Sequence, residues 1–222
     1  MGKLIVIEGT DGSGKSTQFR KLTGRLEQEN RPFQKLVFPQ YSEPSSALIR
    51  MYLGGQFGGS PTDVSAYAAS TFYGVDRYAS YKMDWGSYYE NGGLVVSDRY
   101  TTSNAVHQTS KEPAEKQADF LNWLYDFEYD KLSLPKPDLV IYLDMPTDFS
   151  EKLLRSREQS TNTKADIHEQ DTAYLATCRQ IGRMAAKHYG WQIIDCVRDG
   201  QMRTIEDIHR EIYSLVTATL EG

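Results

Sequence analysis

Cysteine is scarce in this chain, which narrows the classes of protein it can belong to. Only two cysteines occur among 222 residues, and Cys178 and Cys196 fit neither a C-x-x-C motif nor the spacing of a metal site. A disulfide scaffold and a cysteine-ligated metal are therefore not expected. We predict two reduced, structural thiols in a cytoplasmic protein.

Long apolar runs and an excess of basic residues are missing as well. The apolar run at 4–7 is far too short to cross a bilayer, which takes about 20 residues, and no signal-peptide pattern is present. The formal net charge is −5, which argues against a nucleic-acid partner held by a basic surface. We expect a soluble protein that binds neither a membrane nor nucleic acid.

Internal repeats and low-complexity segments are also absent, and the length suits a single domain, residues 1–222, with one core. Apolar runs of strand length occur at 4–7, 33–38, 94–97, 139–143 and 191–195. Helical stretches separate and follow them, among them 173–188 and 205–220. This alternation predicts an α/β fold with a five-stranded parallel sheet flanked by helices and a ligand beyond the carboxyl ends of the strands.

The most informative segment present is GTDGSGKST at 9–17, directly after the first predicted strand. It matches G-x-x-x-x-G-K-[ST], a loop whose backbone N–H groups surround a polyphosphate. Lys15 can reach the β- and γ-phosphate oxygens, and the Ser16 hydroxyl suits magnesium. The residues expected to bind the nucleotide are Gly9, Gly12, Ser13, Gly14, Lys15, Ser16 and Thr17.

Two absences restrict the class of nucleotide-binding protein. No N-K-x-D motif is present to read guanine, which excludes a GTPase. Residues 53–56 read LGGQ and lack the serine of the transporter ATPase signature, and Asp98 is followed by Arg99 rather than by a catalytic glutamate. A kinase for a small molecule remains.

Two Asp–Arg pairs are candidates for the rest of the site. Arg99 follows a strand, where its guanidinium can hold phosphate oxygens in a bidentate manner, and Asp98 can orient a magnesium-bound water. Arg77 follows the aromatic Tyr73 by one helical turn, so the two share a face suited to a flat base. Purely structural roles, an ion pair that ties a loop to a strand and an aromatic in the core, stay open for both.

The order of these segments resembles the thymidylate kinase family from residue 3 to about residue 195. The segments that carry the resemblance are 9–17, 38–41, 72–77, 98–100, 103–104, 134–138 and the polar stretch at 155–170. The resemblance implies a three-layer P-loop kinase fold with a mobile lid at about 155–170. It also implies Mg²⁺ and ATP as cofactors, transfer of the γ-phosphoryl group to dTMP, a role in dTTP synthesis, and a homodimer.

The same resemblance assigns residues to the base of dTMP. Tyr73 matches the aromatic that stacks on thymine, Arg77 the arginine near the base carbonyl, and Asn104 the residue that reads the base edge. Phe38 and Leu53 match apolar groups around the pyrimidine.

Other matches concern the sugar, the phosphates and the lid. Arg99 matches the arginine that holds the acceptor phosphate, Asp11 an acid that meets the 3′-hydroxyl, and Tyr41 lies in a segment near that phosphate. Asp166 and Glu169 match acidic anchors of the lid. Ser16 and Asp98 are the expected metal-binding residues.

The chain departs from the family at four positions. Gly12 stands where some members have arginine, so Arg155 and Arg157 of the lid are expected to supply the catalytic charge, beside Lys15, Asp98 and Arg99. His107 stands where relatives often have tyrosine against the 2′ face of the sugar, Gln40 where they often have arginine, and Ile167 follows the lid aspartate in place of arginine.

Three alternatives stay open at this stage. A deoxynucleoside kinase needs a carboxylate base after the second strand, and residues 38–41 read FPQY without an acid. A kinase for another nucleoside monophosphate is the second. The third is a regulatory nucleotide-binding module without turnover, against which Lys15, Asp98 and Arg99 count.

Overall fold

The molecule is built on a parallel sheet of five strands in the order β2-β3-β1-β4-β5. The structure is a computed structural model that describes residues 1–161 and 172–221, without the side chains of 157–161 and 172. The strands are β1 (Lys3–Gly9), β2 (Gln34–Val37), β3 (Leu94–Asp98), β4 (Leu139–Asp144) and β5 (Gln192–Asp195). The predicted α/β class, strand number and parallel pairing are confirmed.

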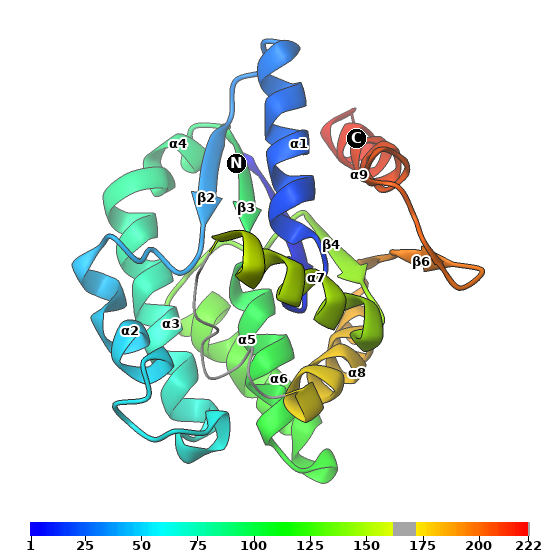
Figure 1. Ribbon diagram of the computed structural model, residues 1–222. Coiled ribbons are helices and arrows are strands. Elements are labelled where there is room, and N and C mark those ends of the chain that lie inside the picture. The colour runs from blue at the N-terminus through cyan, green and yellow to red at the C-terminus, as the bar shows by residue number, and fades with distance from the viewer. Residues whose placement is uncertain (162–171, 222) are drawn as a thin grey trace.

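Helices enclose the sheet on both faces (Figure 1). The α-helices are α1 (Lys15–Gln28), α2 (Ala47–Leu53), α3 (Ala66–Ser80), α4 (Gly86–Glu90), α5 (Thr101–His107), α6 (Gln117–Tyr125), α7 (Thr147–Thr161), α8 (Thr172–Tyr189) and α9 (Ile205–Glu221). Short 3₁₀ turns occupy Pro44–Ser46, Pro61–Asp63, Thr109–Lys111 and Ala114–Lys116, and a small hairpin joins β6 (Val197–Arg198) to β7 (Gln201–Met202).

Alternate residues of the strands belong to two separate hydrophobic cores, one on each face of the sheet, because successive side chains of a strand point to opposite faces. Ile5 and Ile7 pack with Leu22 of α1 and with α9, whereas Leu4 and Val6 pack against the α3, α5, α6 and α8 side. Both faces of β1 are therefore covered, which explains why its sequence is a near-continuous apolar run rather than an alternating one.

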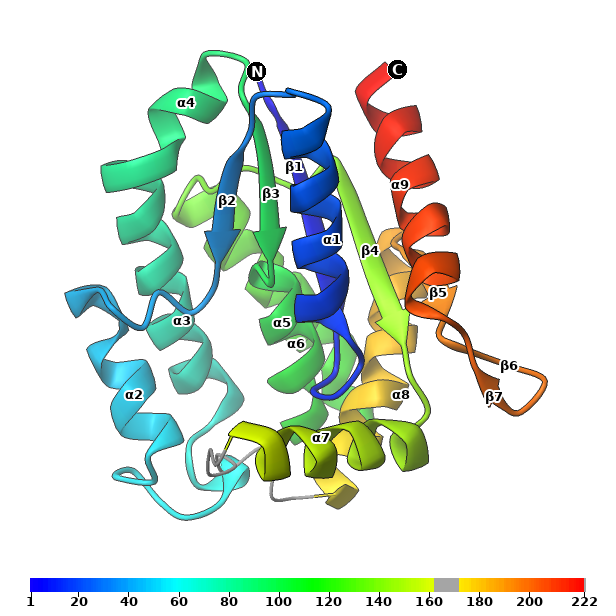
Figure 2. The same cartoon turned by 45° about the horizontal axis from the view of Figure 1, so that its top comes forward.

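The pairing register brings the functional ends of the strands together. Ile7 of β1 lies opposite Asp98 of β3 and Ile141 of β4, so the phosphate-binding loop leaves the sheet beside the Asp98–Arg99 pair. Helix α7 lies across this end of the sheet, toward which the strand arrows point (Figure 2).

Several local features were not predicted from the sequence. Residues 155–161 of the expected lid continue α7, and the remainder of the lid, 162–170, lies outside the described residues. Helix α3 runs through a π-helical turn at Tyr81–Trp85 into α4, and α6 runs into another at Asp126–Lys131. Among the described residues, no helix has both the length and the apolarity needed to span a bilayer.

Candidate functional site

The phosphate-binding loop curls between β1 and α1 as its sequence predicts. Gly12 and Gly14 have φ angles of 76° and 89°, which side chains of L-residues rarely tolerate. Lys15 is 6% exposed, and its ammonium donates to the carbonyl of Thr10 at 2.8 Å. Burial lowers the pKa of Lys15, and the nearby Arg99 cation lowers it further. An anion bound here would offset both effects.

Ser16 and Asp98, the two expected metal-binding residues, lie next to each other. The Ser16 hydroxyl donates to Asp98 Oδ2 at 3.3 Å, from the first turn of α1 to the end of β3. Hydroxyl and carboxylate oxygens are ligands that suit magnesium. In the described part of the chain no three acidic, histidine or cysteine side chains form a metal cluster. The pair thus fits a metal that takes its other ligands from a nucleotide and water.

Arg99 lies at the junction of the phosphate loop and α5. Its backbone has φ 70°, and its N–H donates to the carbonyl of Ile7 at 3.1 Å. The guanidinium forms an ion pair with Asp11, donates to Ser103 Oγ at 3.3 Å and lies 3.4 Å from His107 Nε2. Burial alone would lower the pKa of Arg99, but the charges of Asp11 and other nearby acids raise it above its usual value.

Glu8 is a member of this network that the sequence analysis missed. Its fully buried carboxylate accepts from the Gly9 N–H at 2.9 Å and from the hydroxyls of Thr102 and Ser103, both at 2.7 Å. Arg99 Nη1 lies 3.8 Å from it. A single acid directly after the apolar run at 4–7, before the first glycine of the phosphate loop, is the signal that could have revealed it, since a buried charge requires partners.

A cavity next to this network is lined by all the residues expected to contact the acceptor. It lies between the end of β2, the α2–α3 segment and α5. Its lining comprises Asp11, Phe38, Pro39, Tyr41, Leu53, Tyr73, Arg77, Arg99, Tyr100, Ser103, Asn104, His107 and Gln108. All nine residues that the sequence analysis assigned to the substrate are present.

Arg77 meets a second buried acid that the sequence analysis did not single out. Arg77 is 2% exposed and Glu128 fully buried, and the guanidinium pairs with both carboxylate oxygens, with Nε 2.6 Å from Oε2. Burial alone would lower the pKa of Arg77, and the ion pair with Glu128 raises it above its usual value. Glu128 stands in the segment DFEYDK, where nothing in the sequence distinguishes it from its acidic neighbours.

Asp76 holds the segment that bears Tyr41 against α3. Its carboxylate accepts from the Gln40 N–H at 2.9 Å and from the Ser45 hydroxyl at 2.6 Å. The contribution of Gln40 to the site is thus its backbone N–H, which helps to hold the neighbouring Tyr41 segment at the cavity. Phe38 packs against Tyr100 of the inner wall, with ring centroids 6.0 Å apart.

His107 is held in place by two residues of α8 and by the 3₁₀ turn that follows α5. Tyr174 and Ser110 both donate to its carbonyl at 2.7 Å, and Cys178 Sγ lies 3.6 Å from Nδ1. Burial raises the pKa of the Cys178 thiol to about 12, so the thiol is neutral. Both cysteines are free and buried, as predicted.

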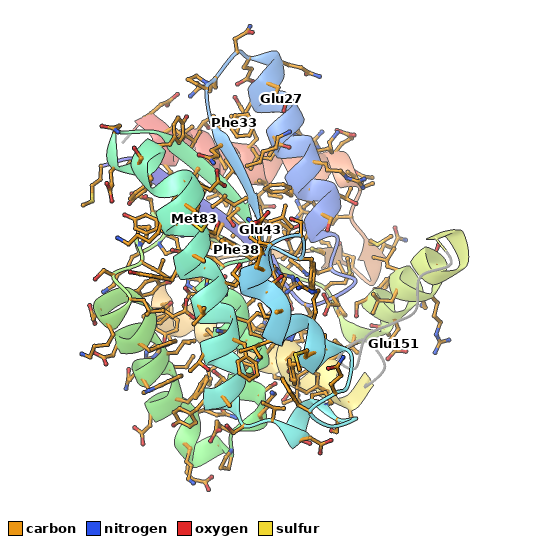
Figure 3. All side chains as sticks on the ribbon, turned by 90° about the vertical axis from the view of Figure 1, so that its left-hand side faces the viewer. Glu27, Phe33, Phe38, Glu43, Met83 and Glu151 are labelled. Atoms are coloured by element: carbon orange, nitrogen blue, oxygen red, sulfur yellow. The ribbon has the colours of Figure 1, made fainter. Side chains whose placement is uncertain are left out.

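Helix α7 closes the phosphate side of the site against Gly12. A Cβ atom at Gly12 would lie 2.5 Å from the carbonyl oxygen of Ser150 and 3.0 Å from Leu154, so no arginine fits there in this arrangement. A second hollow lies between the phosphate loop, the end of β2 and α7. Figure 3 marks two of these elements by Phe38 and Glu151.

Arg155, one of the two arginines expected in the lid, is not among the residues that line this hollow. The Arg155 side chain is 77% exposed and lies 3.8 Å from Glu151. Arg157 belongs to α7, but its side chain lies outside the described part of the structure, as do Asp166, Ile167 and Glu169.

Comparison with known proteins identifies relatives over nearly the whole chain. The family model described as thymidylate kinase matches residues 7–212. Thymidylate kinase of Mycobacterium tuberculosis is 31% identical over 196 residues, covering 86% of this chain and 90% of the relative. That of Dictyostelium discoideum is 31% identical over 215 residues, covering 96% and 84%. The thymidylate kinase structure from Candida albicans superposes with a TM-score of 0.69 at 22% identity, covering 98% and 92%, and thus shares the fold.

Proposed function

This chain belongs to the thymidylate kinase family and phosphorylates dTMP, and from that premise we propose how its residues divide the task. The loop at 9–17 binds the phosphates of ATP, and the cavity beneath Phe38 binds dTMP. The observation that carries the proposal is that the two hollows lie next to each other. Their linings share Asp11, Phe38, Pro39, Tyr41 and Arg99.

The proposed reaction depends mainly on position and charge. Phosphoryl transfer has a loose transition state with charge spread over the moving group. Lys15 neutralises the donor phosphates, and Arg99 holds the acceptor phosphate on the opposite side. Magnesium, held through Ser16 and Asp98, would add positive charge at the donor. The phosphate of dTMP is largely a dianion near neutral pH, so no general base is required.

Asp11 and the lid complete the assignment. Asp11 is ion-paired with Arg99 and lies 3.7 Å from Lys15. These contacts support a carboxylate between the two proposed phosphate sites, which would accept a hydrogen bond from the sugar 3′-hydroxyl. Arg155 and Arg157 bring further charge when the lid closes. The family resemblance supports a homodimer, the scarcity of cysteine supports a cytoplasmic location, and the chain length supports a single domain over residues 1–222.

A coupled assay of ADP release across nucleoside monophosphates tests the proposal. We expect dTMP to react best and dUMP more weakly, because a lost methyl contact costs about 1–3 kcal/mol. A purine should not fit. Equal turnover of dTMP and dCMP would show that the base does not lie between Tyr73, Arg77 and Asn104.

A further inference from the structure

Glu128 is a fully buried acid outside the cavity that contacts two residues of its wall. Oε2 accepts from Arg77 Nε at 2.6 Å and from the Thr101 hydroxyl at 2.7 Å. Oε1 accepts from Arg77 Nη2 and from Asn104 Nδ2 at 3.2 Å. The carboxylate thus accepts four hydrogen bonds, and two of its partners, Arg77 and Asn104, also line the cavity.

These bonds determine which way the Asn104 amide points. Nδ2 donates to Glu128 and to the carbonyl of Ser70 at 3.3 Å, so both of its N–H groups are engaged. Both partners only accept, and turning the amide over would set its oxygen against two other oxygens. No hydrogen bond within the described residues engages Oδ1. The atom that Asn104 offers to a ligand is therefore an acceptor.

Arg77 offers hydrogen-bond donors to the cavity, whereas Asn104 offers an acceptor. A guanidinium has five N–H donors and no acceptor. Glu128 takes one from Nε and one from Nη2, and the Tyr100 carbonyl takes one from Nη1 at 3.4 Å. One N–H remains on each terminal nitrogen. The cavity wall thus presents a donor at Arg77 and an acceptor at Asn104.

We infer that Glu128 is a positioning residue that sets base specificity by fixing this donor–acceptor pair. The inference rests on the proposed placement of the base between Arg77 and Asn104. Thymine and uracil carry a carbonyl acceptor at position 4 and an N3–H donor, which complement the pair. Cytosine carries an amino donor at position 4 and an acceptor at N3, so both contacts would be mismatched.

Replacement of the acid by its amide provides the test. In Glu128→Gln an NH₂ group replaces one oxygen and faces an N–H of Arg77 or Asn104, which favours turning the Asn104 amide so that Nδ2 points into the cavity. We expect the ratio of kcat/KM for dTMP to that for dCMP to fall at least about tenfold. The KM for dTMP should rise while kcat at saturation changes less than about threefold, because the phosphate sites are untouched.

Two further variants separate specificity from stability. Thr101→Val removes another hydrogen bond to Glu128 but leaves the Arg77 and Asn104 contacts intact, so the dTMP/dCMP ratio should stay within about twofold even where Tm falls. Glu128→Asp keeps the charge but shortens the reach, and should lose part of the discrimination. An unchanged ratio in a folded Glu128 variant, or an equal loss in Thr101→Val, would overturn the inference.

A measurement on the unaltered protein covers the case in which both Glu128 variants fail to fold. Both protons of the Asn104 side-chain amide should exchange slowly with solvent in NMR spectra, with and without dTMP, because both are hydrogen-bonded and buried. Fast exchange of either proton contradicts the inference. If the unaltered enzyme turns over dCMP as well as dTMP, the proposed base site itself is wrong. If the unaltered enzyme prefers dTMP and the Glu128 variants keep the same preference, only the role of Glu128 is wrong.

Discussion

At the scale of single residues, Arg99 joins more parts of the site than any other side chain discussed above. Its φ of 70° is uncommon for a residue other than glycine and marks a strained position. It contacts Asp11 of the phosphate loop and Ser103 and His107 of α5. The planar guanidinium can make these contacts and still direct N–H groups at a phosphate, which an ammonium cannot.

Arg99→Lys keeps the positive charge but removes the planar guanidinium with its paired N–H donors. We expect kcat/KM for dTMP to fall at least about 100-fold, since bidentate recognition of the phosphate is lost. The KM for ATP should change little. Steady-state kinetics with each substrate varied in turn checks this, and a kcat/KM within threefold of the parent would exclude a direct phosphate contact.

Lys111 provides a stability prediction at the same scale. It donates to the Tyr52 hydroxyl at 2.9 Å and to the Val64 carbonyl at 3.1 Å, and thereby ties the α2–α3 segment to the end of α5. Burial lowers its pKa from 10.5 to about 7. Below about pH 7 the amine is charged in both the folded and unfolded states. Between about pH 7 and pH 10.5 only the unfolded state holds the proton.

The free energy of unfolding should therefore rise as pH increases from about 7 toward 9 because of Lys111. Lys111→Met removes the titrating group, so urea unfolding of this variant should show a smaller rise over the same interval. Identical pH profiles for variant and parent would mean that the amine keeps an ordinary pKa in the folded protein.

At the scale of elements, the contact between α7 and the phosphate loop depends on the missing side chain at Gly12. Gly12→Ala would force a Cβ against the Ser150 carbonyl at 2.5 Å in a backbone conformation that L-residues avoid. We expect α7 to separate from the loop, with faster proteolysis within α7 and a lower kcat.

Gly24→Ala is the matched control for Gly12→Ala. Gly24 lies in α1 with no atom within 4 Å of the added carbon, and alanine favours a helix over glycine by about 1 kcal/mol. It should be neutral or stabilising, with unchanged kcat. If Gly12→Ala behaves the same way, α7 does not depend on this contact.

The arginines of α7 allow catalysis to be separated from folding. Arg155 is exposed, and an exposed ion pair such as that with Glu151 contributes about 0–1 kcal/mol. Arg155→Ala should thus leave Tm nearly unchanged. Either Arg155→Ala or Arg157→Ala should lower kcat at least about 100-fold if lid closure brings that arginine to the transferring phosphate. Glu151→Ala breaks the same ion pair and should retain kcat. Near-normal kcat in both arginine variants would remove the lid from the mechanism.

At the scale of the whole molecule, four parts of the chain line the acceptor site: the phosphate loop, the segment after β2, the α2–α3 segment and the region of α5. Binding of dTMP should therefore stabilise the fold as a unit. At 100 times its Kd, dTMP would add about 2.7 kcal/mol, which raises Tm by roughly 5 to 10 °C for a chain of this size. Differential scanning fluorimetry measures the shift. Arg99→Lys should show a much smaller shift at the same dTMP concentration, and an equal shift would show that dTMP binds elsewhere.

The sequence could predict the sheet and the phosphate loop because both depend on local patterns. Continuous apolar runs indicate parallel strands that helices cover on both faces, and the loop motif occupies nine consecutive residues. Glu8 and Glu128 are different, since their roles come from partners brought together only by the fold. The helix at 155–161 could not be predicted from the sequence because these residues are polar throughout: the last apolar residue before them is Leu154, which α7 buries.

The central position of β1 has a consequence for how the protein is made. Both of its neighbours come later in the chain, β3 beginning at Leu94 and β4 at Leu139. At roughly 5–20 residues per second on the ribosome, β1 waits roughly 4–17 s for its first partner strand. During that interval an apolar segment has no sheet to join, which is a state that chaperones recognise. The nucleotide-binding loop is thus synthesised before either strand that pairs with β1, and its supporting strand joins a sheet only after β3 has been made.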